Sequence, residues 1–342
     1  MNTSTHTSTA NPTTAAGDDT AWSADALAGL AAAYAQSQRT TGLLVIHHRR
    51  TVIERNWPVP AGDEAFTRKY VHGTRQEGAL REDVASQQKS VVALLAVMAE
   101  ERGLLDVVQP VSAYVGAGWS RASAAQERAI AVQHLLAMES GLRDDLTFEA
   151  PPGARHHYNT PAYAALLPVL EAATRQTVDE ITQDWLTAPA GMADTSWCRR
   201  SVELEADLGN PRGLVTTPRD LARFGQIVLD GGVVESGARV VSQAQMQRML
   251  VRSALNPAYG WLWWLNGGSR WTMPRRGEGP GSVVATAPAD AVFALGSENR
   301  VLMVAPSLNL VLVRLGQQAP DPDIREQLAR LLTLAHRHES TA

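Results

Sequence analysis

Residues 85–99 read ASQQKSVVALLAVMA, a short polar turn followed by nine apolar residues in succession. An apolar run of this kind is typical of a helix that is buried on every side, and Ser86 can begin that helix. Lys89 stands at its head, although only Lys69 and Lys89 are lysines among the 31 basic residues of the chain. Burying an amine is costly without a purpose, so this stretch is the first candidate for a reactive site.

Ser86 and Lys89 share one face of the predicted helix, because residues three apart are neighbours. A serine hydroxyl at a helix N-terminus can act as a nucleophile, and its backbone N–H can help to hold the oxyanion. Lysine suits the role of base because burial lowers its pKa from about 10.4, whereas arginine cannot be deprotonated in a protein. The spacing alone is weak evidence, since a chain with 20 serines and two lysines can produce it by chance.

Helices are expected on both sides of this stretch. Ser23 can cap a helix that runs to about Gln38, and residues 86–230 read mainly as helices and loops. Within them, Thr217 and Pro218 begin a well-marked helix that ends at a Gly-Gly pair. A last helix is expected to begin at Asp321, with an apolar face formed by Ile324, Leu328, Leu331, Leu332 and Ala335.

Strands are expected near both ends of the chain, where β-branched and aromatic residues are separated by turn residues. The basic run HHRR at 47–50 is expected to lie at a hairpin tip between two of them. Adjacent strands with short links predict an antiparallel sheet. The expected strands cover 42–48, 51–57, 259–266, 291–296, 300–306 and 308–316.

The predicted fold class is therefore α+β, an antiparallel sheet flanked by the N- and C-terminal helices, with an inserted, mostly helical domain. We expect a disordered tail over 1–20, a sheet domain formed by 21–85 and 235–338, and a helical domain over 86–234. The cleft between the two domains is the natural place for a ligand.

A second element with chemistry is PPGARHHYNTPAY at 151–163. Tyr158 and Asn159 follow a Pro-Gly turn and precede a helix-forming run. A tyrosine at such a junction can share protons with Lys89 and serve a leaving group, although a tyrosine with a satisfied hydroxyl is the more common case. His156 and His157 could suggest a metal, but adjacent side chains diverge and no third ligand stands at a useful spacing.

Composition excludes several classes of protein. A net charge of −4 without a basic patch is not typical of nucleic-acid binding, and no apolar run approaches a membrane span. The first twenty residues lack a secretory pattern, and Cys198 is the only cysteine, so we expect a cytoplasmic protein. No phosphate loop, dinucleotide fingerprint or Gly-x-Ser-x-Gly elbow is present, and we expect no metal or organic cofactor.

Taken together, these segments resemble the serine β-lactamase and penicillin-binding-protein superfamily, in its class C-like branch of esterases, amide hydrolases and acyltransferases. SQQKS is similar to the Ser-x-x-Lys motif of that family, with Ser86 as nucleophile and Lys89 as base. PGARHHYNTPAY resembles its Pro-Gly…Tyr motif and places Tyr158 in the second catalytic position. VQHLLAMESGL, GLVTTPRDLARFGQIVLDGG and YGWLWWLN resemble further family blocks in the expected order, over about 22–335.

Two departures from the family pattern bear on the substrate. Tyr158-Asn159-Thr160 resembles the branch of nylon-oligomer hydrolases more than lactamases with Tyr-x-Asn, and Asn159 is carried over as a substrate contact. The third lactamase motif, Lys/His-Thr/Ser-Gly, appears as Ala-Leu-Gly at 294–296. Only Gly296 matches, so the cation that would meet a β-lactam carboxylate is missing. In the same register, the N–H of Ser297 would be the second oxyanion donor beside that of Ser86.

The tryptophans of WLWW and Trp271 have two interpretations. Trp264 and Trp271 could wall an apolar acyl pocket, or the strand could place Trp261 and Trp263 in the core while Trp264 faces the other way. The core interpretation is the more common one for such residues.

The expected function is a serine hydrolase that cleaves a small ester or amide through an acyl-enzyme, with an oligomeric state that the residues do not indicate. Three alternatives stay open at this point. These are a biosynthetic acyltransferase or cyclase that uses the same acyl-enzyme, a non-catalytic binding protein on a lactamase scaffold, and a weak β-lactamase.

Overall fold

A computed structural model describes residues 37–330, and its largest sheet has six strands, every neighbouring pair antiparallel. The first two strands turn at His48 and Arg49, whose φ angles of 47° and 63° suit a two-residue hairpin. The antiparallel sheet expected from the sequence is confirmed. In spatial order its strands are β2 (Arg50–Asn56), β1 (Thr40–His47), β12 (Leu310–Gly316), β11 (Val301–Ala305), β10 (Val292–Leu295) and β7 (Trp264–Leu265).

A second sheet of four strands supports the segment that leads into Ser86. Its inner strands pair Glu82 with Thr216 and Asp83 with Val215. The sequence pattern predicts none of its four strands, which have only four or five residues each. In spatial order the strands are β3 (Val71–Thr74), β4 (Leu80–Asp83), β6 (Arg212–Thr216) and β5 (Ser196–Arg199), and a separate hairpin joins β8 (Arg270–Met273) to β9 (Gly277–Pro280).

The helix that follows Ser86 is α3 (Gln88–Glu101), and every residue from Gln88 to Ala99 is buried. The prediction of a helix without a solvent face is confirmed. The Ser90 hydroxyl donates to the carbonyl of Leu262 at 2.8 Å, which ties the start of α3 to the segment before β7. Lys89 is therefore held inside the protein by the helix that carries it.

Helix α11 (Pro218–Leu229) packs against β1, β11 and β12. Its N-cap is Thr217, whose side chain accepts from the backbone N–H of Asp220, as the sequence predicts. Gly225 lets the helix approach the sheet closely, because a Cβ there would lie 2.6 Å from Val311 and 2.8 Å from Leu302.

Two expectations about the last third of the chain need correction. The strand expected over 259–266 is only two residues long, because Leu262 has a φ of 57° and breaks the extended backbone. The last helix has Ile324 as its first residue, two later than the Pro322 expected after an Asp321 N-cap, and Asp321 instead accepts from the N–H of Asp323 at 2.8 Å. Part of that helix, and the helix expected from Ser23, lie outside the described residues.

The remaining helices are short, and most of them come between α3 and β7 in the sequence. They are α2 (Glu64–Tyr70), α4 (Ser112–Val115), α5 (Ala124–Glu127), α6 (Val132–Leu136), α7 (Thr160–Ala164), α8 (Leu166–Thr174), α9 (Val178–Thr182), α10 (Val202–Leu208), α12 (Gln243–Met249), the 3₁₀ turns Gln76–Gly78, Ala85–Gln87 and Pro306–Leu308, and the π-helical turn Gln183–Thr187.

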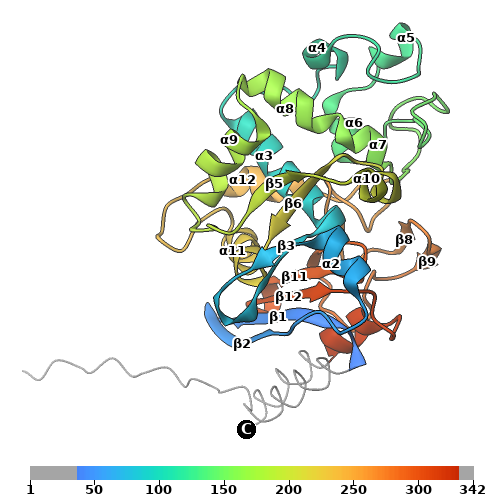
Figure 1. Cartoon of the computed structure of the whole chain (residues 1–342). Helices are drawn as coiled ribbons and strands as arrows, with labels where there is room; N and C mark the ends of the chain where they lie inside the picture. Colours follow the sequence, from blue (N-terminus) through green and yellow to red (C-terminus); the bar gives the residue numbers. More distant parts are fainter. Residues whose placement is uncertain (1–36, 331–342) are drawn as a thin grey trace, which may run out of the picture.

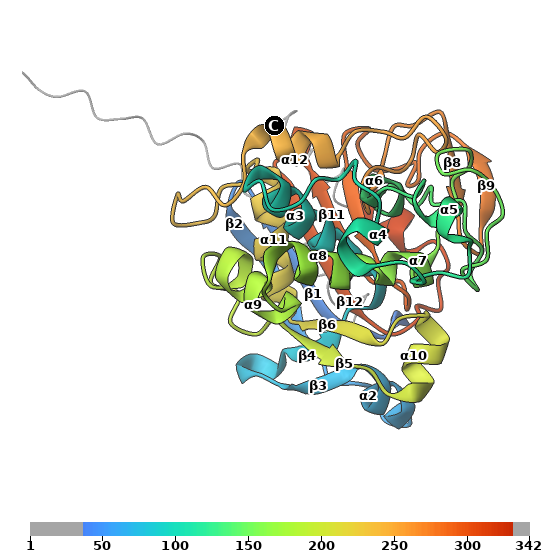
Figure 2. The same ribbon diagram turned by 90° about the horizontal axis from the view of Figure 1, so that it is seen from above.

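Figure 1 shows α4 to α9 gathered at one end of the molecule and strands β1, β2, β11 and β12 at the other. In the view from above, α3 and α11 lie over this sheet, while β3 to β6 form a separate layer beside α2 and α10 (Figure 2). The exact domain boundaries stay a prediction. None of the helices in residues 37–330 has the length and apolar character needed to cross a membrane.

Candidate active site

Ser86 lies in a strained turn between β4 and α3. The preceding residue, Ala85, has a left-handed φ of 50°, a conformation that costs a residue with a side chain about 1–2 kcal/mol. Its backbone N–H donates to Asp83 Oδ1 at 2.8 Å, which stabilises the turn. Within residues 82–90, only Ser86 is partly open to solvent. The turn therefore presents one hydroxyl at the surface of an otherwise buried segment.

Lys89 lies one turn further along, and its Nζ donates to Ser86 Oγ at 2.9 Å. The side chain of Lys89 is buried, with 3% of the residue exposed. Burial, and secondarily the nearby charge of Arg200, lowers the pKa of Lys89 to about 7. A large share of these amines is therefore neutral at neutral pH and can accept a proton from Ser86.

Tyr158 reaches the same point from the loop before α7. Burial raises the pKa of Tyr158 to about 12, and a hydrogen bond with Ser86 opposes that shift. Its ring centroid lies 5.0 Å from Lys89 Nζ, and the ring of Tyr163 lies 4.7 Å from the same atom. The structure thus brings together the three residues that the sequence nominates, with the amine between two aromatic rings.

The end of β10 lies against the Ser86 turn. The side chain of Gln87 donates to the carbonyl of Ala294 at 3.2 Å. Gly296 follows, and a Cβ at this position would lie 2.7 Å from the carbonyl oxygen of Val84, so only glycine allows this approach. Ser297, the next residue, is partly exposed, as is Ser86. The segment expected to supply a second oxyanion donor is therefore packed beside Ser86.

Asn159 has a different place from the one expected. Its amide nitrogen donates to the carbonyls of Leu142 and Arg143 at 3.0 and 2.9 Å, and its oxygen accepts from the N–H of Ala162. The residue is 1% exposed. Its amide hydrogen bonds are therefore made with the backbone, which argues against the expected substrate contact and favours a role in holding the loop that carries Tyr158.

The two histidines before Tyr158 diverge. His157 Nε2 lies 3.0 Å from Asp144 Oδ1 near the surface, whereas the ring of His156 packs edge-on against Tyr259 at 5.0 Å. Burial lowers the pKa of His156 to about 4, so its ring is neutral at neutral pH. Among residues 37–330, no three His, Cys, Asp or Glu side chains gather as a metal site would require.

Trp264 contacts the candidate catalytic residue Tyr158, whereas Trp271 lies in a separate hairpin. The ring of Trp264 stacks on Tyr158 with centroids 5.9 Å apart, and Tyr259 meets both rings edge-on. Trp263 is fully buried, as the core interpretation expects, whereas Trp261 is only partly buried. Trp271 lies in the β8–β9 hairpin against Gly279, with Arg276 over its ring. Sequence reasoning did not single out Tyr259, although it is the first residue of the block YGWLWWLN.

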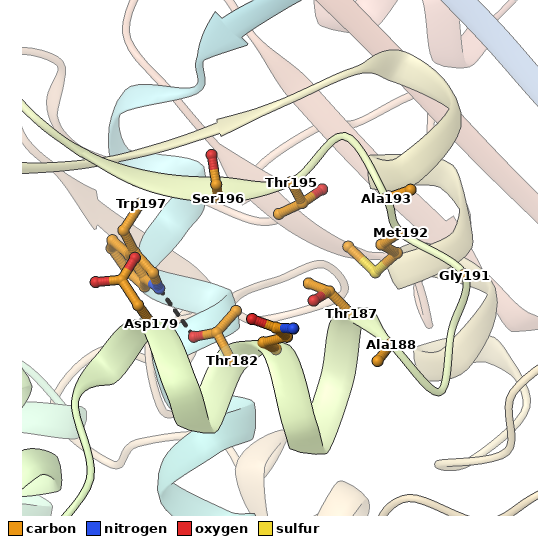
Figure 3. A pocket seen from close by; sticks show the side chains of 11 residues that line it. Asp179, Thr182, Thr187, Ala188, Gly191, Met192, Ala193, Thr195, Ser196 and Trp197 are labelled. Carbon is orange, nitrogen blue, oxygen red and sulfur yellow. Dashed lines mark hydrogen bonds between the residues drawn. The ribbon is translucent and has the colours of Figure 1, made fainter.

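A described cavity lies elsewhere. It has a volume of about 430 Å³ and opens between α9, the π-helical turn and β5 (Figure 3). Trp197 Nε1 donates across one end of it to Thr182 Oγ1 at 2.8 Å. None of Ser86, Lys89 and Tyr158 lines this cavity. The candidate active site is therefore defined by its side-chain geometry and not by this cavity.

Comparison with known proteins identifies a matching family model and similar folds. A sequence model of the beta-lactamase family matches residues 6–337. Among solved structures, a beta-lactamase from Mycobacterium bovis is similar, with 17% identity and a TM-score of 0.63 over 92% of this chain and 99% of that one. No curated protein matches the chain.

Two further solved structures are similar over most of their length. A Bacillus anthracis protein provisionally assigned as a 6-aminohexanoate-dimer hydrolase has 18% identity and a TM-score of 0.65, over 91% of this chain and 82% of that one. EstCE1, a hydrolase with promiscuous acyltransferase activity, has 16% identity and a TM-score of 0.62, over 92% and 98%. At such identities the likeness shows the fold alone.

Proposed function

Because the chain belongs to the beta-lactamase family, we propose that it is a serine hydrolase that cleaves an ester or amide through an acyl-enzyme on Ser86. The observation that carries the proposal is the 2.9 Å contact between Ser86 Oγ and the buried amine of Lys89. A nucleophile within hydrogen-bond reach of a base is the arrangement that this chemistry requires.

The two neighbouring proton carriers divide the work by their pKa values. Lys89, with a pKa of about 7, is the base that takes the proton as Ser86 Oγ attacks the carbonyl carbon. Tyr158, with a pKa of about 12, keeps its proton in the resting enzyme and is suited to donate it to the leaving group. The Lys89 ammonium then reprotonates Tyr158, and the acyl group remains on Ser86.

The oxyanion of the tetrahedral intermediate would accept from two backbone N–H groups, those of Ser86 and Ser297. Deacylation reverses the proton path. The neutral Lys89 amine takes a proton from water, the water oxygen attacks the acyl carbon, and the proton returns to Ser86 Oγ as the acid leaves. No metal or organic cofactor takes part in these steps.

The charge around β10 favours an acyl group without a carboxylate beside the scissile bond. Ala294 and Leu295 are buried and apolar where the lactamase motif has a cation and a hydroxyl. Arg300 donates to the carbonyl of Ser297, but it is fully buried and paired with Glu82. A β-lactam carboxylate would therefore lack this cationic partner, and nitrocefin is expected to turn over poorly.

The test is covalent trapping. Incubation with a panel of p-nitrophenyl esters and anilides, followed by intact-mass spectrometry, is expected to show one acyl group on the wild-type protein. Ser86→Ala should lose both the adduct and the release of p-nitrophenol. Ser90→Ala is the matched control, because Ser90 lies one residue after Lys89 but donates to a backbone carbonyl. Retained esterase activity in Ser86→Ala would contradict the proposal.

Acyl transfer to an amine or alcohol is a second candidate, since the same acyl-enzyme serves both reactions. Its support is the likeness to EstCE1, whose acyltransferase activity is known of that protein and not of this chain. Adding alcohols and amines to the ester reaction separates the two outcomes. A new ester or amide product would favour transfer, and unchanged acid formation would favour hydrolysis.

A further inference from the structure

Two acidic residues end β4 immediately before the Ser86 turn, and both are buried. Glu82 is 1% exposed and Asp83 is fully buried. Each pairs with a buried arginine that comes from a distant part of the chain. Arg300 Nη2 lies 3.1 Å from Glu82, and Arg200 Nε lies 2.7 Å from Asp83. Each of the four buried charges costs several kcal/mol of desolvation before it is paired. These two ion pairs are therefore weak evidence for a role in stability alone.

Asp83 and Arg200 hold the turn from both sides of Ser86. Asp83 Oδ1 accepts from the N–H of Ala85, and both carboxylate oxygens accept from Arg200. Arg200 Nη2 also donates to Gln88 Oε1 at 3.2 Å, and the same oxygen accepts from the N–H of Leu214 at 3.0 Å. This ion pair therefore fixes the residue before Ser86 and the second residue after it.

Glu82 and Arg300 hold Ser297 in the corresponding way. Arg300 donates through Nη2 to Glu82 and through Nη1 to the carbonyl of Ser297 at 3.3 Å. The two residues between Ser297 and Arg300, Glu298 and Asn299, both have left-handed φ angles, 63° and 53°. Such a turn is sparsely populated without glycine, so it persists because its surroundings hold it.

Surrounding contacts complete this support. The guanidinium of Arg300 lies 4.4 Å from the ring centroid of Tyr70, and Asn299 Oδ1 accepts from the N–H of Ala319 at 3.0 Å. Arg314, another fully buried arginine, donates to the carbonyl of Glu298 at 2.9 Å. The loop that carries Ser297 is therefore fixed from three directions.

Because successive strand residues point to opposite faces, the neighbours Glu82 and Asp83 can reach both sides of the catalytic centre. We propose that they are positioning residues that act through Arg300 and Arg200 to set the separation of the two oxyanion donors, the N–H groups of Ser297 and Ser86. The proposal rests on the function proposed above. Neither acid contacts the reacting atoms, and their effect is on the transition state rather than on substrate binding.

The test uses Arg300→Lys and Arg200→Lys, which keep the buried charge but lose the guanidinium branches that reach Ser297 and Gln88. Single-turnover acylation by a p-nitrophenyl ester gives the acylation rate constant and the substrate dissociation constant separately. We expect the rate constant to fall about ten- to hundredfold and the dissociation constant to stay within about twofold. Affinity for a boronic acid, whose adduct is tetrahedral, should fall by the same factor as the rate constant.

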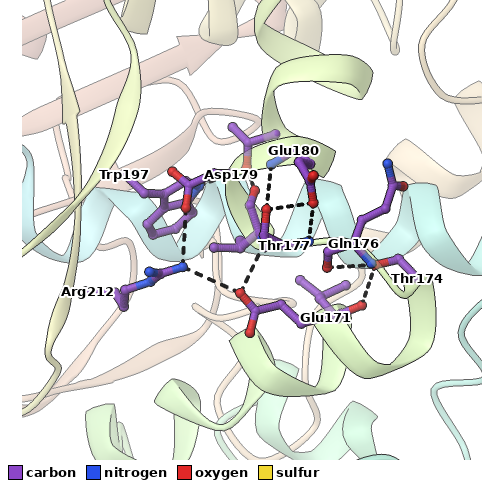
Figure 4. Close-up of polar contacts among 11 residues, drawn as sticks. Glu171, Thr174, Gln176, Thr177, Asp179, Glu180, Trp197 and Arg212 are labelled. Carbon is purple, nitrogen blue, oxygen red and sulfur yellow. Dashed lines mark hydrogen bonds and ion pairs between the residues drawn. The ribbon is translucent and has the colours of Figure 1, made fainter.

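Arg212→Lys is the matched control. Arg212 lies on β6, and its partly exposed side chain pairs with Glu171 and Asp179 at 3.4 Å each rather than with the Ser86 turn (Figure 4). It is expected to keep the wild-type acylation rate and boronate affinity. Should Arg300→Lys or Arg200→Lys fail to fold, the isosteric variants Glu82→Gln and Asp83→Asn are measured in the same way.

The outcomes separate this proposal from the function itself. The first outcome is that an ester acylates Ser86 of the wild-type protein, while Arg300→Lys and Arg200→Lys match Arg212→Lys in acylation rate and boronate affinity. The positioning proposal is then wrong, and the proposed function stands. An equal loss of substrate binding and rate would also overturn it. If a fluorophosphonate fails to label Ser86 in the wild-type protein, the proposed function fails first.

Discussion

The amine of Lys89 lies 2.9 Å from the hydroxyl of Ser86 while its own side chain is almost fully buried. The helix that provides the spacing also provides the apolar surroundings, because α3 is buried on every side. The position of the Lys89 amine and its lowered pKa therefore have the same structural origin, the buried helix α3. Four predictions follow from this contact and its neighbours.

Lys89→Arg is expected to lower the acylation rate about 10³-fold or more, because a guanidinium keeps the positive charge but cannot accept a proton. The burst of p-nitrophenol in stopped-flow kinetics measures this. Lys69→Arg is the natural control, since Lys69 is the only other lysine and pairs on the surface with Glu203 and Asp207. Wild-type bursts from Lys89→Arg would exclude Lys89 as the base.

The acylation rate at low substrate concentration is expected to rise with pH and to level off above about pH 7. Burial lowers the pKa of Lys89 to about 7, and the neutral amine is the active form. No falling limb is expected below pH 10, because the pKa of Tyr158 is about 12. Burst kinetics between pH 5 and 10 test both limbs, and a rate that falls from pH 6 to 8 would contradict this assignment.

Lys89→Met is expected to stabilise the fold at neutral pH while it removes activity. Lys89 has a pKa of about 7 in the folded protein and about 10.4 unfolded, so the unfolded chain binds more protons between these values. The wild-type free energy of unfolding therefore rises with pH across that window.

The stability gain of Lys89→Met should be on the order of a few kcal/mol at pH 7 and should shrink towards pH 10. Urea unfolding at both pH values measures it. Lys69→Met provides the comparison for losing a lysine at the surface. A gain from Lys89→Met that is equal at pH 7 and pH 10 would mean that the buried amine is not the cause.

Tyr158→Phe should reduce turnover about 10²-fold with little loss of thermal stability, because the ring that stacks on Trp264 is kept and only the hydroxyl is lost. Tyr163→Phe is the matched variant, since that ring lies 4.7 Å from Lys89 Nζ but its buried hydroxyl has no hydrogen-bond partner among the described residues. If the two variants lose activity equally, the special role of Tyr158 is not supported.

The sequence predicts most of the fold because its strongest patterns are long. The apolar run after Ser86 and the capped helix at Thr217 are both found where expected. Strands β3 to β6 are missed because four or five residues are too few for a period to be recognised. The strand expected over 259–266 is wrong because a local left-handed residue, Leu262, overrides the β-branched and aromatic pattern.

Some residues of the candidate site could likewise be predicted from the sequence, and others could not. Ser86, Lys89 and Tyr158 lie in recognisable motifs, and the structure brings them together. Arg200 and Arg300 could not be found from spacing, because their partners lie 117 and 218 residues away. A signal for Asp83 and Glu82 does exist, since two carboxylates directly before a buried segment require partners.

These sequence separations also have a consequence for the nascent protein. The turn around Ser86 is completed only after Arg200 and Arg300 have been synthesised and have folded back onto β4. Until then the chain carries a solvated serine and an ordinary protonated lysine. The reactivity proposed for Ser86 would therefore be acquired only when the chain folds.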